Sequence, residues 1–160
     1  MTNNEKLLRQ QLAKVLDWSE AHTDFATALK DMPFDLQGEV PKGLPHSPWQ
    51  LLEHLRIALH DIVEFSRGSK HKSPPWPAGY WPATVAPPDE KAWKRSAASF
   101  MEHLEEMRAL VADPSRELFK PLPHGSGQTL LREVLLAADH NAYHLGQLVL
   151  VRQALNAWPE

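Results

Sequence analysis

The sequence contains no cysteine among its 160 residues. This absence excludes disulfide bonds, thiolate metal sites and a cysteine nucleophile. Long hydrophobic runs are absent too, since no stretch approaches the ~18 consecutive apolar residues of a membrane span. The first ten residues, MTNNEKLLRQ, lack the apolar core of a signal peptide. We therefore expect a cytoplasmic protein that does not cross a membrane.

An excess of positive charge is also missing. Lys and Arg number 17 against 20 Asp and Glu, which leaves a net charge of −3, and no basic run stands out. Nucleic-acid binding depends on clustered cations, so this charge pattern disfavours it. The length fits one domain of ordinary size, and the composition does not change along the chain. We expect residues 1–160 to form a single domain that binds no nucleic acid.

Proline, in contrast, is plentiful and divides the chain. The 14 prolines gather in three stretches and leave four long segments with apolar residues at helical spacing. Ser47, Pro48 and Gln50 form a capping box at the start of the second segment, and Gly68 suits its end. The four segments predict helices over residues 3–31, 47–68, 89–113 and 127–158.

Four amphipathic segments with no alternating strand pattern predict an all-α four-helix bundle. The connection between the second and third helices, SRGSKHKSPPWPAGYWPATVAPP, is far too long for a tight hairpin. A long crossover is what two parallel neighbouring helices require, so we expect an up-down-down-up bundle. The aromatic residues of the crossover, Trp76, Tyr80 and Trp81, are candidates to cover a pocket.

Three of the nine histidines form the candidate site. His140 and His144 are four residues apart, so they lie on one face of the fourth helix, one turn apart. Two such imidazoles can bind one divalent ion. His54 lies inside the apolar run of the second helix and can face them across the bundle. The alternative is three separate surface or hydrogen-bonded core histidines, and the spacing by itself leaves both interpretations open.

The remaining polar candidates have weaker signals. We expect His60 to lie on the opposite side of its helix from His54. Five polar residues near the three histidines are candidates to orient the imidazoles, although a solvated or capping role is equally open to each: Glu53, Asp61, Asp139, Asn141 and Gln147. The other histidines are expected to be solvated or to lie in loops: His22, His46, His71, His103 and His124.

Two motifs carry a resemblance to a known family. The segments SPWQLLEH, residues 47–54, and DHNAYHLGQ, residues 139–147, resemble those of the DinB/YfiT-like superfamily of metalloenzymes. The resemblance spans nearly the whole chain. It implies an up-down-down-up bundle, a homodimer, and a zinc or nickel ion held by His54, His140 and His144.

The resemblance implies several functions. Some relatives transfer low-molecular-weight thiols to electrophilic molecules, and others are described as metal-dependent hydrolases. We therefore predict a metal-dependent enzyme with a small-molecule substrate and, for thiol transfer, an external thiol cosubstrate. No catalytic residue beyond the metal ligands is assigned. The alternative is a non-catalytic bundle whose metal is structural or whose role is to bind a partner, and a fourth protein ligand would favour it.

Overall fold

The computed structural model describes residues 1–158. Five α-helices and two short 3₁₀ turns account for its regular structure, and this part of the chain contains no strand beyond one isolated bridge between Pro121 and Thr129. The prediction of an all-helical protein is confirmed. The elements are α1 Asn3–Val15, α2 Phe25–Leu29, η1 Phe34–Leu36, α3 Pro48–Arg67, η2 Ala78–Tyr80, α4 Ala92–Ala112 and α5 Leu130–Ala154.

The first predicted helix, residues 3–31, is wrong in its extent. α1 ends at Val15, and the chain enters the separate helix α2 only at Phe25. Between them, two aspartates bind backbone N–H groups at the start of α2: Phe25 N donates to Asp17 Oδ1 and Thr27 N donates to Asp24 Oδ1. Side chains of this kind compete with helical hydrogen bonds, and they favour a new helix start over a continuous helix.

The start of α3 follows the predicted capping box. Gln50 N donates to Ser47 Oγ, and Ser47 N donates to Gln50 Oε1. Pro48 occupies the first turn, where its missing N–H costs nothing. The helix ends at Arg67, and Gly68 is its C-cap. These local bonds fix where α3 begins and therefore the height of His54 in the molecule.

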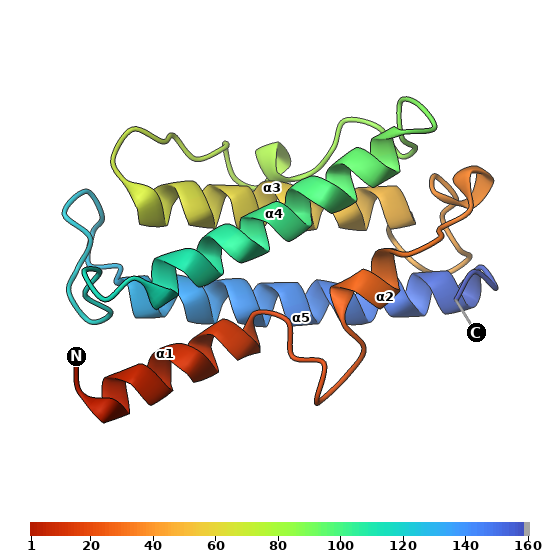
Figure 1. The fold of residues 1–160 in the computed structure, drawn as a ribbon. Coiled ribbons are helices and arrows are strands. Elements are labelled where there is room, and N and C mark those ends of the chain that lie inside the picture. Colours follow the sequence, from red (N-terminus) through yellow and green to blue (C-terminus); the bar gives the residue numbers. More distant parts are fainter. Residues whose placement is uncertain (159–160) are drawn as a thin grey trace.

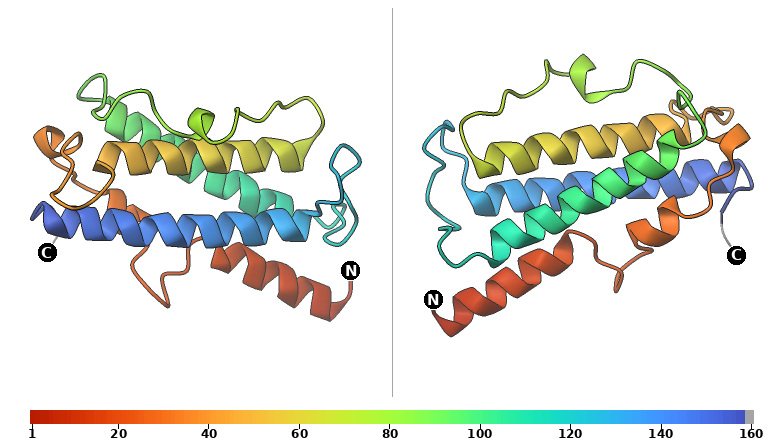
Figure 2. Two further views of the ribbon diagram at one scale, coloured as in Figure 1. Left: turned by 180° about the vertical axis from the view of Figure 1, so that it is seen from behind. Right: turned by 45° about the horizontal axis from the view of Figure 1, so that its top comes forward.

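Residues 68–91 return along the length of α3, with η2 lying against that helix (Figure 1). As a result, α4 begins near the end of the molecule where α3 begins, and the two helices cross (Figure 2). α5 is the longest helix and lies beside α3 along the whole molecule. None of the helices in residues 1–158 combines the length and the apolar character that a membrane span requires.

Two buried arginines fasten the helix ends. Arg9 on α1 donates to the carbonyl of Val111 in the last turn of α4, and to those of Asp113 and Arg116 just after the helix. Arg152 on α5, 1% exposed, donates to the carbonyl of Ala28 and to that of Lys30 just beyond α2. The last carbonyls of a helix lack partners within the helix, so a guanidinium satisfies several at once. These contacts hold α1 and α2 against the bundle.

Candidate metal centre

Three imidazoles from two helices point at one another. His54 lies on α3, and His140 and His144 lie one turn apart on α5. The distance from His54 Nε2 is 3.0 Å to His140 Nε2 and 3.1 Å to His144 Nε2. Donor nitrogens of the three residues all lie within 4.8 Å of one another. The structure therefore brings together all three histidines that the sequence singles out.

In two of the rings, a hydrogen bond on the side away from the cluster determines which nitrogen carries the proton. His54 Nδ1 lies 2.8 Å from the carbonyl oxygen of Tyr80, and His144 Nδ1 lies 2.7 Å from Gln147 Oε1. Both oxygens can only accept, so in each ring the proton belongs on Nδ1. Nε2 of His54 and of His144 then carries a lone pair when the ring is neutral. Two lone pairs 3.1 Å apart repel unless a cation lies between them.

A proton is a poor candidate for that cation. Burial, together with the neighbouring imidazoles, lowers the pKa of His140 and of His144 to about 4. The pKa of His54 is lowered as well, mainly by burial. Desolvation penalises the charged imidazole in each case. At neutral pH the three rings are uncharged and present the nitrogen lone pairs that a metal ion uses.

The spacing of the nitrogens fits a metal ion. Ligand nitrogens about 2.0–2.1 Å from one zinc stand about 2.9 Å apart at a right angle and about 3.4 Å apart at a tetrahedral angle. The two measured separations, 3.0 and 3.1 Å, lie within this range. His54 and His144 are only 4% and 8% exposed, so the rings are held by packing before any ion arrives. The three-histidine group is thus compatible with a metal site.

The comparison with known families agrees with this geometry. A family model described as the DinB superfamily matches residues 17–148, a segment that contains all three histidines. The chain belongs to the DinB superfamily. No curated protein and no solved structure matched it.

Of the five polar residues considered for orienting the imidazoles of this DinB protein, Gln147 contacts the His144 ring directly, and Asn141 opposes the lowering of the His140 pKa. Asp61 contacts the His54 ring only through Tyr80: it accepts a hydrogen bond from the Tyr80 hydroxyl at 2.6 Å, and the Tyr80 carbonyl contacts His54. Glu53 instead binds Arg56 and Ser96. Asp139 is exposed, and the side-chain amide of buried Asn141 has no hydrogen-bond partner.

The crossover loop covers the centre with one aromatic ring. Trp81 stacks on His54, with ring centroids 4.0 Å apart and an angle of 3° between the planes. His46 also stacks on Trp81, at 4.2 Å. Trp76, in contrast, is 79% exposed and packs only against Tyr80. Sequence reasoning missed the carbonyl of Tyr80 as a partner of His54, because a backbone contact leaves no signal in residue type.

Other histidines of the DinB chain make contacts that the sequence did not predict. His71 and His103 were expected to be solvated, yet His71 binds Asp61 at 2.7 Å and His103 lies 2.9 Å from His60. His124 contacts the carbonyl oxygen of Phe65 at 2.7 Å. His60 does turn away from His54, and it meets α4 instead of α5. The structure thus contains a second histidine cluster.

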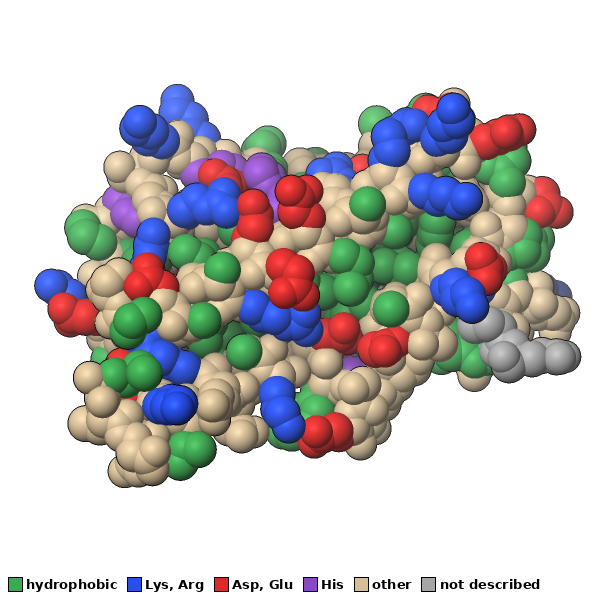
Figure 3. Space-filling model, in the orientation of Figure 1, with side chains coloured by type: hydrophobic (Ala, Val, Ile, Leu, Met, Phe, Trp, Pro, Cys, Tyr) green, Lys and Arg blue, Asp and Glu red, His purple; other side chains and the backbone are tan. Residues whose placement is uncertain are grey.

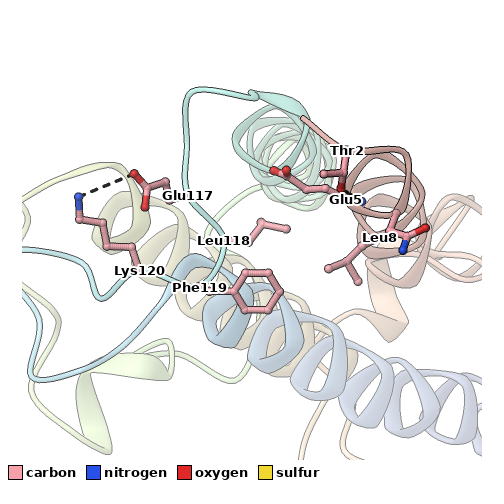
Figure 4. Close-up of a pocket in the computed structure, with 8 residues that line it drawn as sticks. Thr2, Glu5, Leu8, Glu117, Leu118, Phe119 and Lys120 are labelled. Atoms are coloured by element: carbon pink, nitrogen blue, oxygen red, sulfur yellow. Dashed lines mark hydrogen bonds and ion pairs between the residues drawn. The ribbon is translucent and has the colours of Figure 1, made fainter.

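A separate pocket of about 470 Å³ lies away from both histidine clusters (Figure 4). It is formed where the start of α1 meets the chain after α4, with Thr2, Glu5 and Leu8 on one side. Leu118, Phe119 and Lys120 line the other side. The pocket shares no residue with the three-histidine group, so its position adds nothing to the case for a metal site.

Proposed function

We propose that this DinB-superfamily chain is a metal-dependent enzyme acting on a small molecule. One observation carries the proposal: the Nε2 atoms of His54, His140 and His144 converge. Nδ1 of His54 and Nδ1 of His144 each face a hydrogen-bond acceptor, which leaves Nε2 free to bind an ion. Zinc and nickel are the proposed ions, because neutral imidazoles suit both. Burial keeps the rings neutral and therefore ready to bind.

The proposed reaction is either transfer of a low-molecular-weight thiol to an electrophile or hydrolysis. A metal ion with open positions stabilises a bound thiolate, or lowers the pKa of a bound water to about 7. The chain itself has no cysteine, so the thiol is an external cosubstrate. The Tyr80 carbonyl and Gln147 hold the His54 and His144 rings in place, and Trp81 shields one face of His54 from water.

The number of protein ligands favours an enzyme over a structural metal site. Structural zinc sites usually use four protein ligands, whereas catalytic sites use three and leave a position open. In residues 1–158 the histidine group has three members and no acidic or histidine fourth member. The alternative is a non-catalytic bundle with a structural metal or a partner-binding role. For a structural metal, a fourth ligand would have to come from another molecule.

We also propose the finer arrangement: a single domain, residues 1–160, folded as an up-down-down-up four-helix bundle of α1, α3, α4 and α5, with α2 as an addition. The return of residues 68–91 along α3 supports this order. A cytoplasmic location is proposed from the composition, which lacks cysteine.

A homodimer is proposed through the outer face of α5. Leu136, Tyr143 and Leu150 recur there every seven residues and are 36%, 64% and 52% exposed. Gly146 lies on the same helix, and a side chain at this position would meet nothing in its own chain. A glycine without an internal packing reason permits the close approach of another helix. Sedimentation analysis of Leu150→Glu beside wild type tests this: a wild-type monomer contradicts it.

The enzyme proposal is tested first by elemental analysis of untagged protein. Wild type is compared with His140→Ala/His144→Ala, each loaded with zinc or nickel and then dialysed. About one ion per chain is expected in wild type and none in the variant. His22→Gln serves as the matched control, because His22 is exposed and contacts only the neighbouring Thr23 carbonyl.

A metal-loaded wild type is then screened with thiol cosubstrates plus electrophiles, and with hydrolysable esters and amides. Turnover that requires the metal and disappears in the double variant supports an enzyme. A wild type that binds no metal after reconstitution overturns the metal site and the enzyme together. Tight metal binding with every position filled by protein ligands, seen by X-ray absorption, favours the structural alternative.

A further inference from the structure

A second pair of histidines bridges α3 and α4. His60 Nδ1 lies 2.9 Å from His103 Nε2, and the ring centroids are 4.8 Å apart. Neither residue belongs to the three-histidine group. Figure 3 shows histidine side chains gathered on the surface over α3 and α4, with basic and acidic side chains next to them. Both residues of this pair are half-buried, whereas His54 and His144 of the three-histidine group are buried.

A third imidazole stands beside the pair. The ring of His71, from the crossover loop, is 5.7 Å from that of His60 and roughly perpendicular to it. Asp61 holds His71 in this position through the bond to Nε2. The donor atoms of these residues are not close enough to form a three-ligand group like that of His54. The cluster therefore offers two converging nitrogens and one nearby imidazole.

The surroundings of the pair are mixed in charge. Burial lowers the pKa of His103, and the neighbouring His60 lowers it further. Glu106 and Arg56 act on His103 with opposite sign. Arg67 is bound to both Glu64 and Glu106, so its charge is largely compensated. A divalent ion approaching the pair thus meets no large excess of positive charge.

We propose that His60 and His103 form a second, weaker metal site for a borderline divalent ion such as Cu²⁺, Ni²⁺ or Zn²⁺. Imidazole nitrogens suit these ions, and a 2.9 Å separation matches two ligands at about a right angle around one ion. Without metal, one ring donates an N–H to the other. On binding, that proton moves to the other nitrogen of its own ring, and both facing lone pairs bind the ion. Water fills the remaining positions.

The proposal does not depend on the enzyme activity, and a titration separates the two sites. Untagged protein without metal is titrated with Cu²⁺ and with Ni²⁺ by calorimetry. Wild type is expected to bind about two ions, one tightly and one more weakly. His140→Ala/His144→Ala retains only the weaker site. His60→Gln/His103→Gln retains only the tighter one. Binding at the weaker site is expected to be stronger for Cu²⁺ than for Ni²⁺.

A spectroscopic readout identifies the ligands. In His140→Ala/His144→Ala loaded with one Cu²⁺, electron paramagnetic resonance is expected to show coupling to imidazole nitrogen, and adding His103→Gln removes it. His22→Gln is the control for nonspecific loss of a histidine. The proposal is overturned if His60→Gln/His103→Gln leaves the titration unchanged, or if the weaker binding persists in a variant lacking all five residues. Circular dichroism confirms that each variant is folded.

Discussion

Two histidine clusters share α3, and they differ in what surrounds them. His54 faces α5, where two further imidazoles meet it, while His60 faces α4 and meets one. In the first cluster acceptors hold the proton on the outer nitrogen of two rings, and lone pairs are forced together. In the second cluster a single shared proton joins the two facing nitrogens, His60 Nδ1 and His103 Nε2. The same residue type thus forms one group whose facing lone pairs are compatible with a bound cation and one pair whose facing nitrogens are joined by a hydrogen bond.

Burial accounts for much of this difference. His54 is only 4% exposed, so its ring loses little contact with water when it binds a metal ion. The ion also becomes a partner for its buried Nε2. The His60–His103 pair keeps partial contact with solvent and has a satisfied hydrogen bond to lose. The buried cluster should therefore bind metal far more tightly, and four experiments measure how far this contrast extends.

The largest effect is expected from His54→Ala compared with His60→Ala. Removing His54 leaves two ligands on one helix and exposes the His140 and His144 nitrogens to water. Affinity for zinc at the tight site should fall by about a thousandfold or more, which corresponds to about 4 kcal/mol. His60→Ala should leave that affinity unchanged. Competition with a fluorescent zinc chelator measures both, and equal losses in the two variants would contradict the contrast.

Acid should destabilise the metal-free protein through the buried cluster. The pKa of His140 and of His144, about 4 when folded, lies below the ordinary 6.5, so the unfolded chain binds protons first as pH falls. Stability is thus complete above about pH 6.5 and is lost towards about pH 4, by an amount on the order of 3 kcal/mol for each residue. Urea unfolding at pH 7 and pH 5 measures this. The difference in the free energy of unfolding between the two pH values should shrink in His140→Gln/His144→Gln. It should persist in His60→Gln/His103→Gln.

A smaller effect is expected from the groups that orient the buried rings. Gln147→Ala removes the acceptor at His144 Nδ1, which frees the ring to rotate and to change tautomer. Metal affinity should fall by about 10- to 100-fold, as is usual when such a partner is lost. Gln153→Ala, an exposed position on the same helix, is the matched control. An affinity that is the same in both variants would show that packing alone orients His144.

The smallest effect is expected from His103→Gln in the absence of metal. Only the hydrogen bond to His60 and part of the ring packing are lost. The free energy of unfolding should decrease by about 0.5–1.5 kcal/mol, the net value of one neutral hydrogen bond. Denaturant titration beside His22→Gln measures it. A loss as large as several kcal/mol would mean that the pair holds α3 and α4 together structurally.

Local signals in the sequence predicted much of the fold. The capping box at Ser47 and Gln50 determined where α3 begins, because both bonds lie within one turn. Proline clusters marked the ends of the long helices. The break between α1 and α2 was missed because the caps at Asp17 and Asp24 lie in a segment without proline or glycine.

In the candidate site, too, local sequence spacing predicted some features and tertiary packing decided the others. The four-residue spacing of His140 and His144 by itself placed both on one face of a helix, since helix geometry is local. Only the tertiary structure decided that His54 meets them, that the Tyr80 carbonyl holds its proton, and that His60 and His103 pair across α3 and α4. These contacts join residues 26 to 90 positions apart, and their geometry depends on how whole helices and the crossover loop pack, which no short pattern of residues encodes.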